Sequence, residues 1–206
     1  MDTVSNQIND KWLKASVLAG LWAGIEIIAG SFLHNLKIPL SGTFLTIISI
    51  ILVLGFFQIW PNRGIMWRAG LITALMKSIS PSAIILGPMV AIFMEGLVLE
   101  LTVWMLGKNL FSYIAAGAFT LLSVLMQKIA RLWMMYGLDI FQIYENMYKA
   151  GIQKLGIAYS SPTPAVITLF ALYAVLGALA ALVGYSIGKR ASKMQKNELP
   201  VCQSNY

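Results

Sequence analysis

Residues 12–33 read WLKASVLAGLWAGIEIIAGSFL, and this stretch decides the fold class. Apart from Lys14 near its start and Glu26, its side chains are apolar or small. A helix of about 20 such residues is long enough to cross the hydrocarbon core of a bilayer. An ionisable side chain inside such a span is costly and usually faces protein or water rather than lipid. We therefore predict a membrane-spanning helix with Glu26 turned toward the protein interior and His34 at its edge.

The composition of the whole chain agrees with a membrane protein. Hydrophobic residues make up 58% of the 206 residues and charged residues 11%, far from the balance of a soluble globular protein. The net charge of +7 does not indicate nucleic-acid binding, because the basic residues cluster at the ends of apolar segments. The single cysteine, Cys202, excludes an internal disulfide and a cysteine-rich metal site.

Prolines, glycines and polar residues divide the chain into apolar segments. We expect six helices, at 12–34, 43–60, 64–79, 83–106, 110–134 and 163–188. The third is short and carries Arg68 and Lys77, so a broken or re-entrant helix is the alternative. The fold class is an all-α integral membrane protein with a six-helix transmembrane bundle in one domain, 1–188. A polar, basic cytoplasmic tail follows at 189–206, and we expect it to be disordered.

A polar-rich segment, 138–156, separates the fifth and sixth expected helices. Its large apolar residues recur at helical spacing: Phe141, Tyr144, Tyr148, Ile152 and Leu155. This pattern predicts an amphipathic helix that lies on membrane lipids at the outer interface. A lid over an internal cavity is the functional alternative.

Basic residues and tryptophans indicate the orientation. With the N-terminus inside, more Lys and Arg residues lie on the inner side than on the outer side. An aromatic belt would form at the inner ends of the helices from Trp12, Trp60, Trp67 and Trp104. We therefore expect a multi-pass protein of the cell inner (cytoplasmic) membrane with both termini in the cytoplasm.

The first helix carries a face of small residues. Ala15, Ala19 and Ala23 are spaced by four and share this face with Glu26. Small residues let helix backbones approach closely, which favours helix association in membranes. The strip is either a packing seam inside the subunit or a docking strip for another membrane subunit. The sixth expected helix carries two similar small-residue motifs, Gly177-x-x-x-Ala181 and Gly184-x-x-x-Gly188.

The fourth expected helix contains a second membrane-embedded carboxylate. Gly87, Ala91 and Glu95 are spaced by four, so a stripe of small residues ends in a carboxylate. Glu100 lies on another face and nearer the cytoplasm. Glu95 alone could pair with Arg68, Lys77 or Lys128 of a neighbouring helix. Glu26 and Glu95 together favour a polar cavity inside the bundle.

Lys128 and Arg131 lie three residues apart near the outer end of the fifth helix, beside Gln127. Like charges at this spacing repel each other unless an anion lies between them. Either the two side chains extend to the outer headgroups, or they form the anion-binding side of the cavity. We expect a small-molecule substrate to be bound by Glu26, His34, Asn35, Glu95, Gln127, Lys128 and Arg131.

Motifs of the common enzyme classes are missing from the sequence. It contains no G-x-x-x-x-G-K-[ST], no H-E-x-x-H and no G-x-S-x-G, and His34 is its only histidine. A membrane enzyme working through His34 and Glu26 is therefore the weakest alternative. We expect no enzymatic activity, no cofactor and no catalytic metal.

The topology and several short motifs resemble the substrate-binding S-component of energy-coupling-factor (ECF) type ABC transporters. These features are six spans in about 200 residues, inside termini, the alanine strip, the polar loop His34–Gly42 and the stretch Pro81–Met89. The chain begins Met1-Asp2-Thr3, without the N-terminal Met-His metal site of the cobalt and nickel branch of that family.

This resemblance implies a subunit that captures a micronutrient, a vitamin or its precursor, from outside. Release inward would then be driven by a membrane coupling subunit and two ATPase subunits. Ala15, Ala19 and Ala23 would be the docking strip for the coupling subunit. The alternative is a stand-alone small membrane transporter or channel that uses Glu26 and Glu95 as cation or proton sites.

Overall fold

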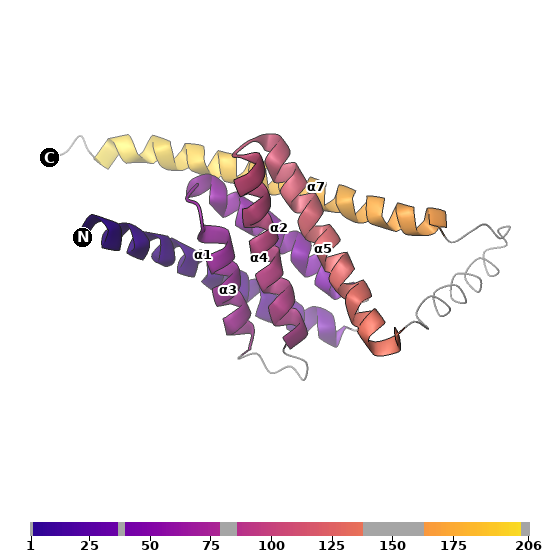
Figure 1. Ribbon diagram of the computed structural model, residues 1–206. Coiled ribbons are helices and arrows are strands. Elements are labelled where there is room, and N and C mark those ends of the chain that lie inside the picture. The colour runs from indigo at the N-terminus through magenta and orange to yellow at the C-terminus, as the bar shows by residue number, and fades with distance from the viewer. Residues whose placement is uncertain (1, 37–39, 79–85, 138–162, 203–206) are drawn as a thin grey trace.

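The computed structural model describes residues 2–36, 40–78, 86–137 and 163–202 (Figure 1). Every regular element within these ranges is an α-helix. The helices are α1 (Asp2–Asn35), α2 (Ser41–Ile59), α3 (Ile65–Lys77), α4 (Leu86–Leu106), α5 (Leu110–Tyr136) and α7 (Thr163–Cys202). The prediction of an all-α fold is thereby confirmed for the described residues. The amphipathic segment 138–156 lies outside them.

Five of the described helices are long and apolar enough to cross a membrane, which agrees with a multi-pass membrane protein. The exception is α3, whose 13 residues extend about 20 Å at 1.5 Å per residue. A hydrocarbon core of about 30 Å is thicker than that. The predicted span at 64–79 is therefore a continuous helix that is too short to cross a membrane by itself.

Two helices are longer than the sequence pattern predicted. The first, α1, begins at Asp2 rather than at 12, and α7 continues to Cys202 rather than ending at 188. The prediction of disorder was therefore wrong for 189–202. Lys, Arg, Ala, Met and Gln predominate after Gly188 and are good helix formers. They extend an existing helix, so they avoid the cost of nucleating a new one.

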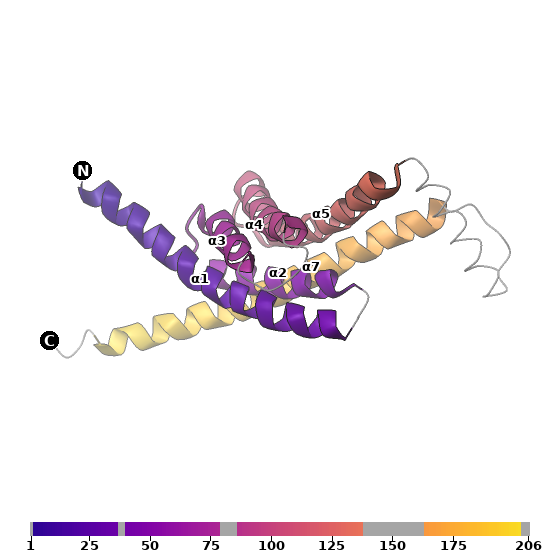
Figure 2. The ribbon, with the colours of Figure 1, turned by 90° about the horizontal axis from the view of Figure 1, so that it is seen from below.

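The six helices pack as a closed ring in the order α1, α3, α4, α5, α7 and α2, with α2 returning to α1. The helix α2 also contacts α3 and α5 across the ring. Figure 2 shows α1 and α7 as two long crossed helices, with α3, α4 and α5 together on one side. Side chains of α2 are therefore well placed to meet those of several other helices.

Small residues form the closest helix contacts. Gly117 of α5 faces Gly177 of α7, so a Cβ atom on either would collide with the backbone of the other. Gly184 and Gly188 likewise lie against the backbone of α2. The close packing predicted for the glycine motifs of the last helix is confirmed, and its partners are α5 and α2.

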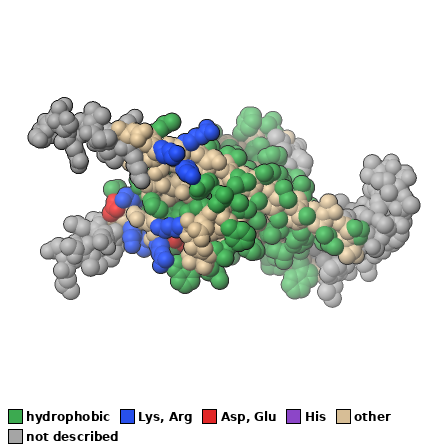
Figure 3. Space-filling view, turned by 90° about the horizontal axis from the view of Figure 1, so that it is seen from above, with side chains coloured by type: hydrophobic (Ala, Val, Ile, Leu, Met, Phe, Trp, Pro, Cys, Tyr) green, Lys and Arg blue, Asp and Glu red, His purple; other side chains and the backbone are tan. Residues whose placement is uncertain are grey.

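Apolar side chains cover much of the outer surface. On α1 the exposed face consists of large apolar residues: Leu13, Val17, Leu21, Ile28 and Phe32. Figure 3 shows apolar side chains over the middle of one face, whereas Lys and Arg gather toward the end at which both termini lie. The apolar band suits a lipid environment, and the basic side chains and the termini share one end of the molecule.

Candidate functional site

Glu26 of α1 is buried and interacts with Lys77 of α3. The Lys77 ammonium donates a hydrogen bond to the Glu26 backbone carbonyl at 2.7 Å and lies 3.9 Å from its Oε2. The Ser49 hydroxyl of α2 lies 3.4 Å from Glu26 Oε1. Gly30 leaves room for the ammonium, since a Cβ atom there would lie 3.0 Å from Lys77 Nζ. Glu26 faces the protein interior, as the sequence predicted.

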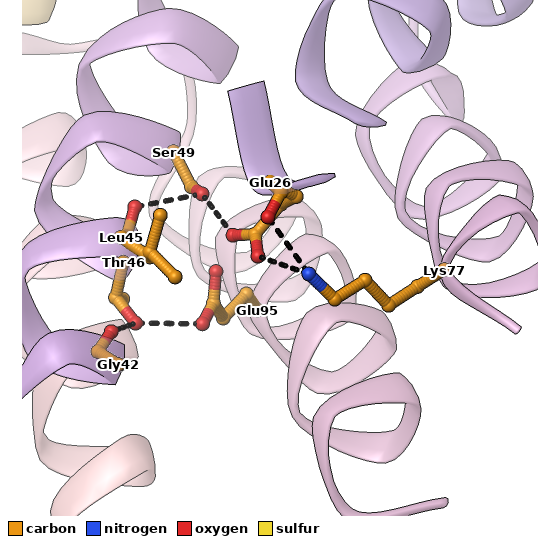
Figure 4. Close-up of polar contacts among 7 residues, drawn as sticks. All are labelled: Glu26, Gly42, Leu45, Thr46, Ser49, Lys77 and Glu95. Atoms are coloured by element: carbon orange, nitrogen blue, oxygen red, sulfur yellow. Dashed lines mark hydrogen bonds and ion pairs between the residues drawn. The ribbon is translucent and has the colours of Figure 1, made fainter. Parts of the chain in front are cut away.

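Glu95 of α4 carries a second buried carboxyl group, and the residue is 4% exposed. Its Oε1 lies 2.7 Å from the Thr46 hydroxyl of α2, whereas its Oε2 has no hydrogen-bond partner among the described residues. Figure 4 shows the carboxyl groups of Glu26 and Glu95 turned toward one another, with Lys77 reaching Glu26 from the other side. Lys77 therefore pairs with Glu26 and not with Glu95.

Lys128 of α5 contacts α2 as well, at a position closer to the N-terminus of α2 than Thr46 and Ser49. Its ammonium donates to the Thr43 hydroxyl at 2.6 Å and lies 3.5 Å from the Tyr173 hydroxyl of α7. Thr43 and Tyr173 are themselves 3.2 Å apart through their hydroxyl oxygens. Lys128 is half-buried, and its side chain points into the bundle in this structure.

The neighbours of Lys128 on α5 are placed differently. Arg131 is exposed, and its guanidinium lies beside Gly87 of α4, 3.1 Å from where a Cβ atom would be. Gln127 is half-buried, and its Nε2 has no hydrogen-bond partner among the described residues. Lys128 and Arg131 therefore contact different helices, α2 and α7 for Lys128 and α4 for Arg131.

A stripe of hydroxyl groups on α2 joins these groups. Thr43, Thr46 and Ser49 follow one another at intervals of three residues and are all buried. They contact, in order, Lys128, Glu95 and Glu26. We call this set the polar core: Glu26, Thr43, Thr46, Ser49, Lys77, Glu95, Lys128 and Tyr173.

The hydroxyl residues of the polar core were not among the predicted site residues. Their signal was nevertheless present, because three hydroxyl residues share one face of an otherwise apolar membrane helix. His34 and Asn35 were predicted site residues, and they lie at the end of α1, about two turns beyond Glu26. Their side chains are outside the described part of the structure.

The alanine strip of α1 lies inside the bundle. Ala15, Ala19 and Ala23 are 0%, 0% and 1% exposed, and the Thr73 hydroxyl of α3 donates to the Ala19 carbonyl at 3.3 Å. In this structure the strip is a packing seam within the subunit. A coupling subunit could reach it only if the helices around α1 moved apart.

The other end of α3 shows what Glu100 does. Its carboxylate accepts hydrogen bonds from the backbone N–H groups of Gly64 at 2.7 Å and Met66 at 3.0 Å. These N–H groups lie at the N-terminal end of α3, so Glu100 of α4 caps the start of a neighbouring helix. Arg68, in the first turn of α3, stacks against Trp12 and Trp67, with its Cζ 5.2 and 5.0 Å from the two rings. Both interactions are structural and lie apart from the polar core.

Comparison of the chain with models of known protein families, with curated proteins and with solved structures finds no match.

Proposed function

We propose that the protein is the substrate-binding subunit of a micronutrient uptake transporter of the ECF type. The polar core supports this proposal, because it gathers buried polar groups from α1, α2, α3, α4, α5 and α7 inside a bundle of apolar helices. Buried polar atoms are normally hydrogen-bonded, and Glu95 Oε2 is one of several buried polar atoms that have no partner among the described residues. A small water-soluble solute would supply the missing partner.

Binding without bond chemistry suits the groups that are present. The described polar core consists of carboxyl, hydroxyl and ammonium groups, and it contains no pairing of a nucleophile with a histidine. Such groups fix the orientation of a polar solute through hydrogen bonds. The proposed mechanism is capture from outside, followed by reorientation that opens the site to the cytoplasm.

The energy for reorientation would come from partners. The sequence has no nucleotide-binding loop, so the proposal includes a membrane coupling subunit and two ATPase subunits. Because the alanine strip is covered, its use as the docking strip requires α1 to become exposed during the transport cycle. This requirement makes the docking assignment directly testable by mutation.

A stand-alone transporter that uses Glu26 and Glu95 as cation or proton sites is the second candidate. It is favoured by one observation, the two carboxyl groups that face one another with Lys77 bound to only one of them (Figure 4). Liposomes containing the purified chain alone distinguish the two candidates. Cation or proton flux without partners would favour the second, whereas tight solute binding without flux would favour the first.

The test of the first candidate compares Glu95→Gln with Glu100→Gln. Native mass spectrometry of protein purified from its host identifies the retained solute, and a direct titration then measures its affinity. Loss of one charge-assisted hydrogen bond costs about 1.5–3 kcal/mol, which corresponds to roughly 10- to 100-fold in affinity. We expect this loss for Glu95→Gln and wild-type affinity for Glu100→Gln. Equal affinities for the two variants would remove Glu95 from the site.

A further inference from the structure

The hydroxyl groups that contact the two carboxyl groups of the polar core are shared with backbone carbonyls. The Thr46 hydroxyl lies within hydrogen-bond distance of both Glu95 Oε1 and the backbone carbonyl of Gly42, at 2.7 and 2.9 Å. The Ser49 hydroxyl similarly lies 3.4 Å from Glu26 Oε1 and 3.0 Å from the Leu45 carbonyl. A hydroxyl group has one proton and can satisfy only one acceptor at a time.

The unpartnered oxygen of Glu95 adds to this shortage. Glu95 is 4% exposed, and Figure 4 shows its carboxyl group turned toward Glu26, whose one charged partner among the described residues is Lys77. A single ammonium balances only one of two facing carboxylates, so the second negative charge is neutralised either by a proton or by a further cation. A cationic donor placed between Glu26 and Glu95 would take the place of that proton and would supply the missing partner of Glu95 Oε2.

Lys128 has the opposite shortage. It is half-buried and contacts the hydroxyl groups of Thr43 and Tyr173, and no carboxylate of the described residues lies within 4.0 Å of it. An ammonium has three donor hydrogens, so Lys128 can still donate to an anionic group. When the ammonium of a ligand keeps both carboxyl groups ionised, the charges of Glu26, Glu95, Lys77 and Lys128 sum to zero, and a ligand with no net charge then leaves the site neutral.

We propose that the solute bound by the polar core is a zwitterion, with an ammonium group between Glu26 and Glu95 and an acidic group at Lys128. This inference rests on the proposed function, because it names the substrate class of the same site. Thr43 and Thr46 are three residues apart on α2, which places them about 5–6 Å apart on the helix surface. The two ends of the ligand must therefore be separated by several bonds, as in an ω-amino acid.

The experiment measures thermal unfolding of the full chain in detergent with added small molecules. The zwitterionic probes are glycine, β-alanine, γ-aminobutyrate and δ-aminovalerate. Butyrate, butylammonium and sodium chloride at equal concentration carry only one of the two features or neither. Since a ligand that binds only the folded state stabilises it, we expect the longer zwitterions to raise the unfolding temperature more than any control.

Charge-removing variants test the assigned ends. Glu95→Gln should weaken binding of the best zwitterion by about 10- to 100-fold and leave it no better than butyrate. Lys128→Gln should weaken it to a similar extent and leave it no better than butylammonium. The matched control is Lys193→Gln, which removes the same charge from an exposed position on α7 and should keep wild-type selectivity. Size-exclusion profiles establish that each variant is folded.

Three results would overturn the inference. These are equal stabilisation by sodium chloride, equal stabilisation by butylammonium alone, and no stabilisation by any zwitterion. If native mass spectrometry still finds a retained solute without an ammonium group, the substrate class is wrong and the binding function stands. If no solute is retained and no probe binds, both proposals fail.

Discussion

Replacing Ala19 by leucine tests whether the alanine strip of α1 is a packing seam or a docking strip. Ala19 is fully buried, and its carbonyl accepts the hydrogen bond from Thr73 of α3. A larger side chain must push the neighbouring helices apart, and such overpacking typically costs about 1–3 kcal/mol. Loss of the Thr73 hydrogen bond adds roughly 0.5–1.5 kcal/mol. We therefore expect Ala19→Leu to lower the free energy of unfolding by about 1.5–4.5 kcal/mol.

The neighbouring residue provides a matched control. Gly20 is exposed, and a Cβ atom there would meet nothing within 4 Å. Gly20→Leu adds a leucine to the lipid-facing side of the same turn of α1. Because leucine also favours helix by up to about 1 kcal/mol over glycine, this variant should be neutral or slightly stabilised. Reversible unfolding in mixed detergent micelles, followed by circular dichroism, measures both changes.

Wild-type stability of Ala19→Leu would refute the packing argument. If that stable variant also failed to co-purify with a coupling subunit, the strip would be a docking surface, as the resemblance implies. A destabilised Ala19→Leu beside an unaffected Gly20→Leu would instead establish the seam inside the isolated subunit.

Three further changes probe the helix contacts, each read as a change in unfolding free energy in the same assay. Glu100→Ala removes both hydrogen bonds at the start of α3 and should lower the free energy of unfolding by about 3 kcal/mol. Glu100→Gln keeps one acceptor and should lower it by about half as much. Equal losses for the two variants would contradict the role of Glu100 as a helix cap. Gly117→Val should cost about 3 kcal/mol or more by separating α5 from Gly177 of α7, and a neutral result would disprove the close approach. Lys77→Met should lower the free energy of unfolding by about 3–5 kcal/mol, because it leaves Glu26 buried without its ion partner. The double variant Lys77→Met/Glu26→Gln should recover part of that loss. No recovery in the double variant would show that the two residues do not act as a pair.

Several features of this fold could be predicted from local sequence. Hydropathy, together with the prolines and glycines that interrupt helices, predicted most ends of the long apolar helices to within a few residues. This was possible because a chain crosses a membrane only as long apolar helices in an all-α protein. The glycine spacing of α7 also predicted close packing correctly. The same local reasoning missed the continuation of α7 to Cys202, because polarity signalled disorder where helix propensity prevailed.

The sequence by itself determined that Glu26 and Glu95 face the interior, since each shares a helix face with small residues and would be costly in lipid. Only the tertiary structure decided which groups they meet. The helix α3 packs against both α1 and α4, yet Lys77 pairs with Glu26 of α1 rather than with Glu95 of α4, and hydroxyl groups of α2 reach both carboxyl groups. Helix periodicity fixes the face on which a side chain lies, but its partner depends on how separate helices pack.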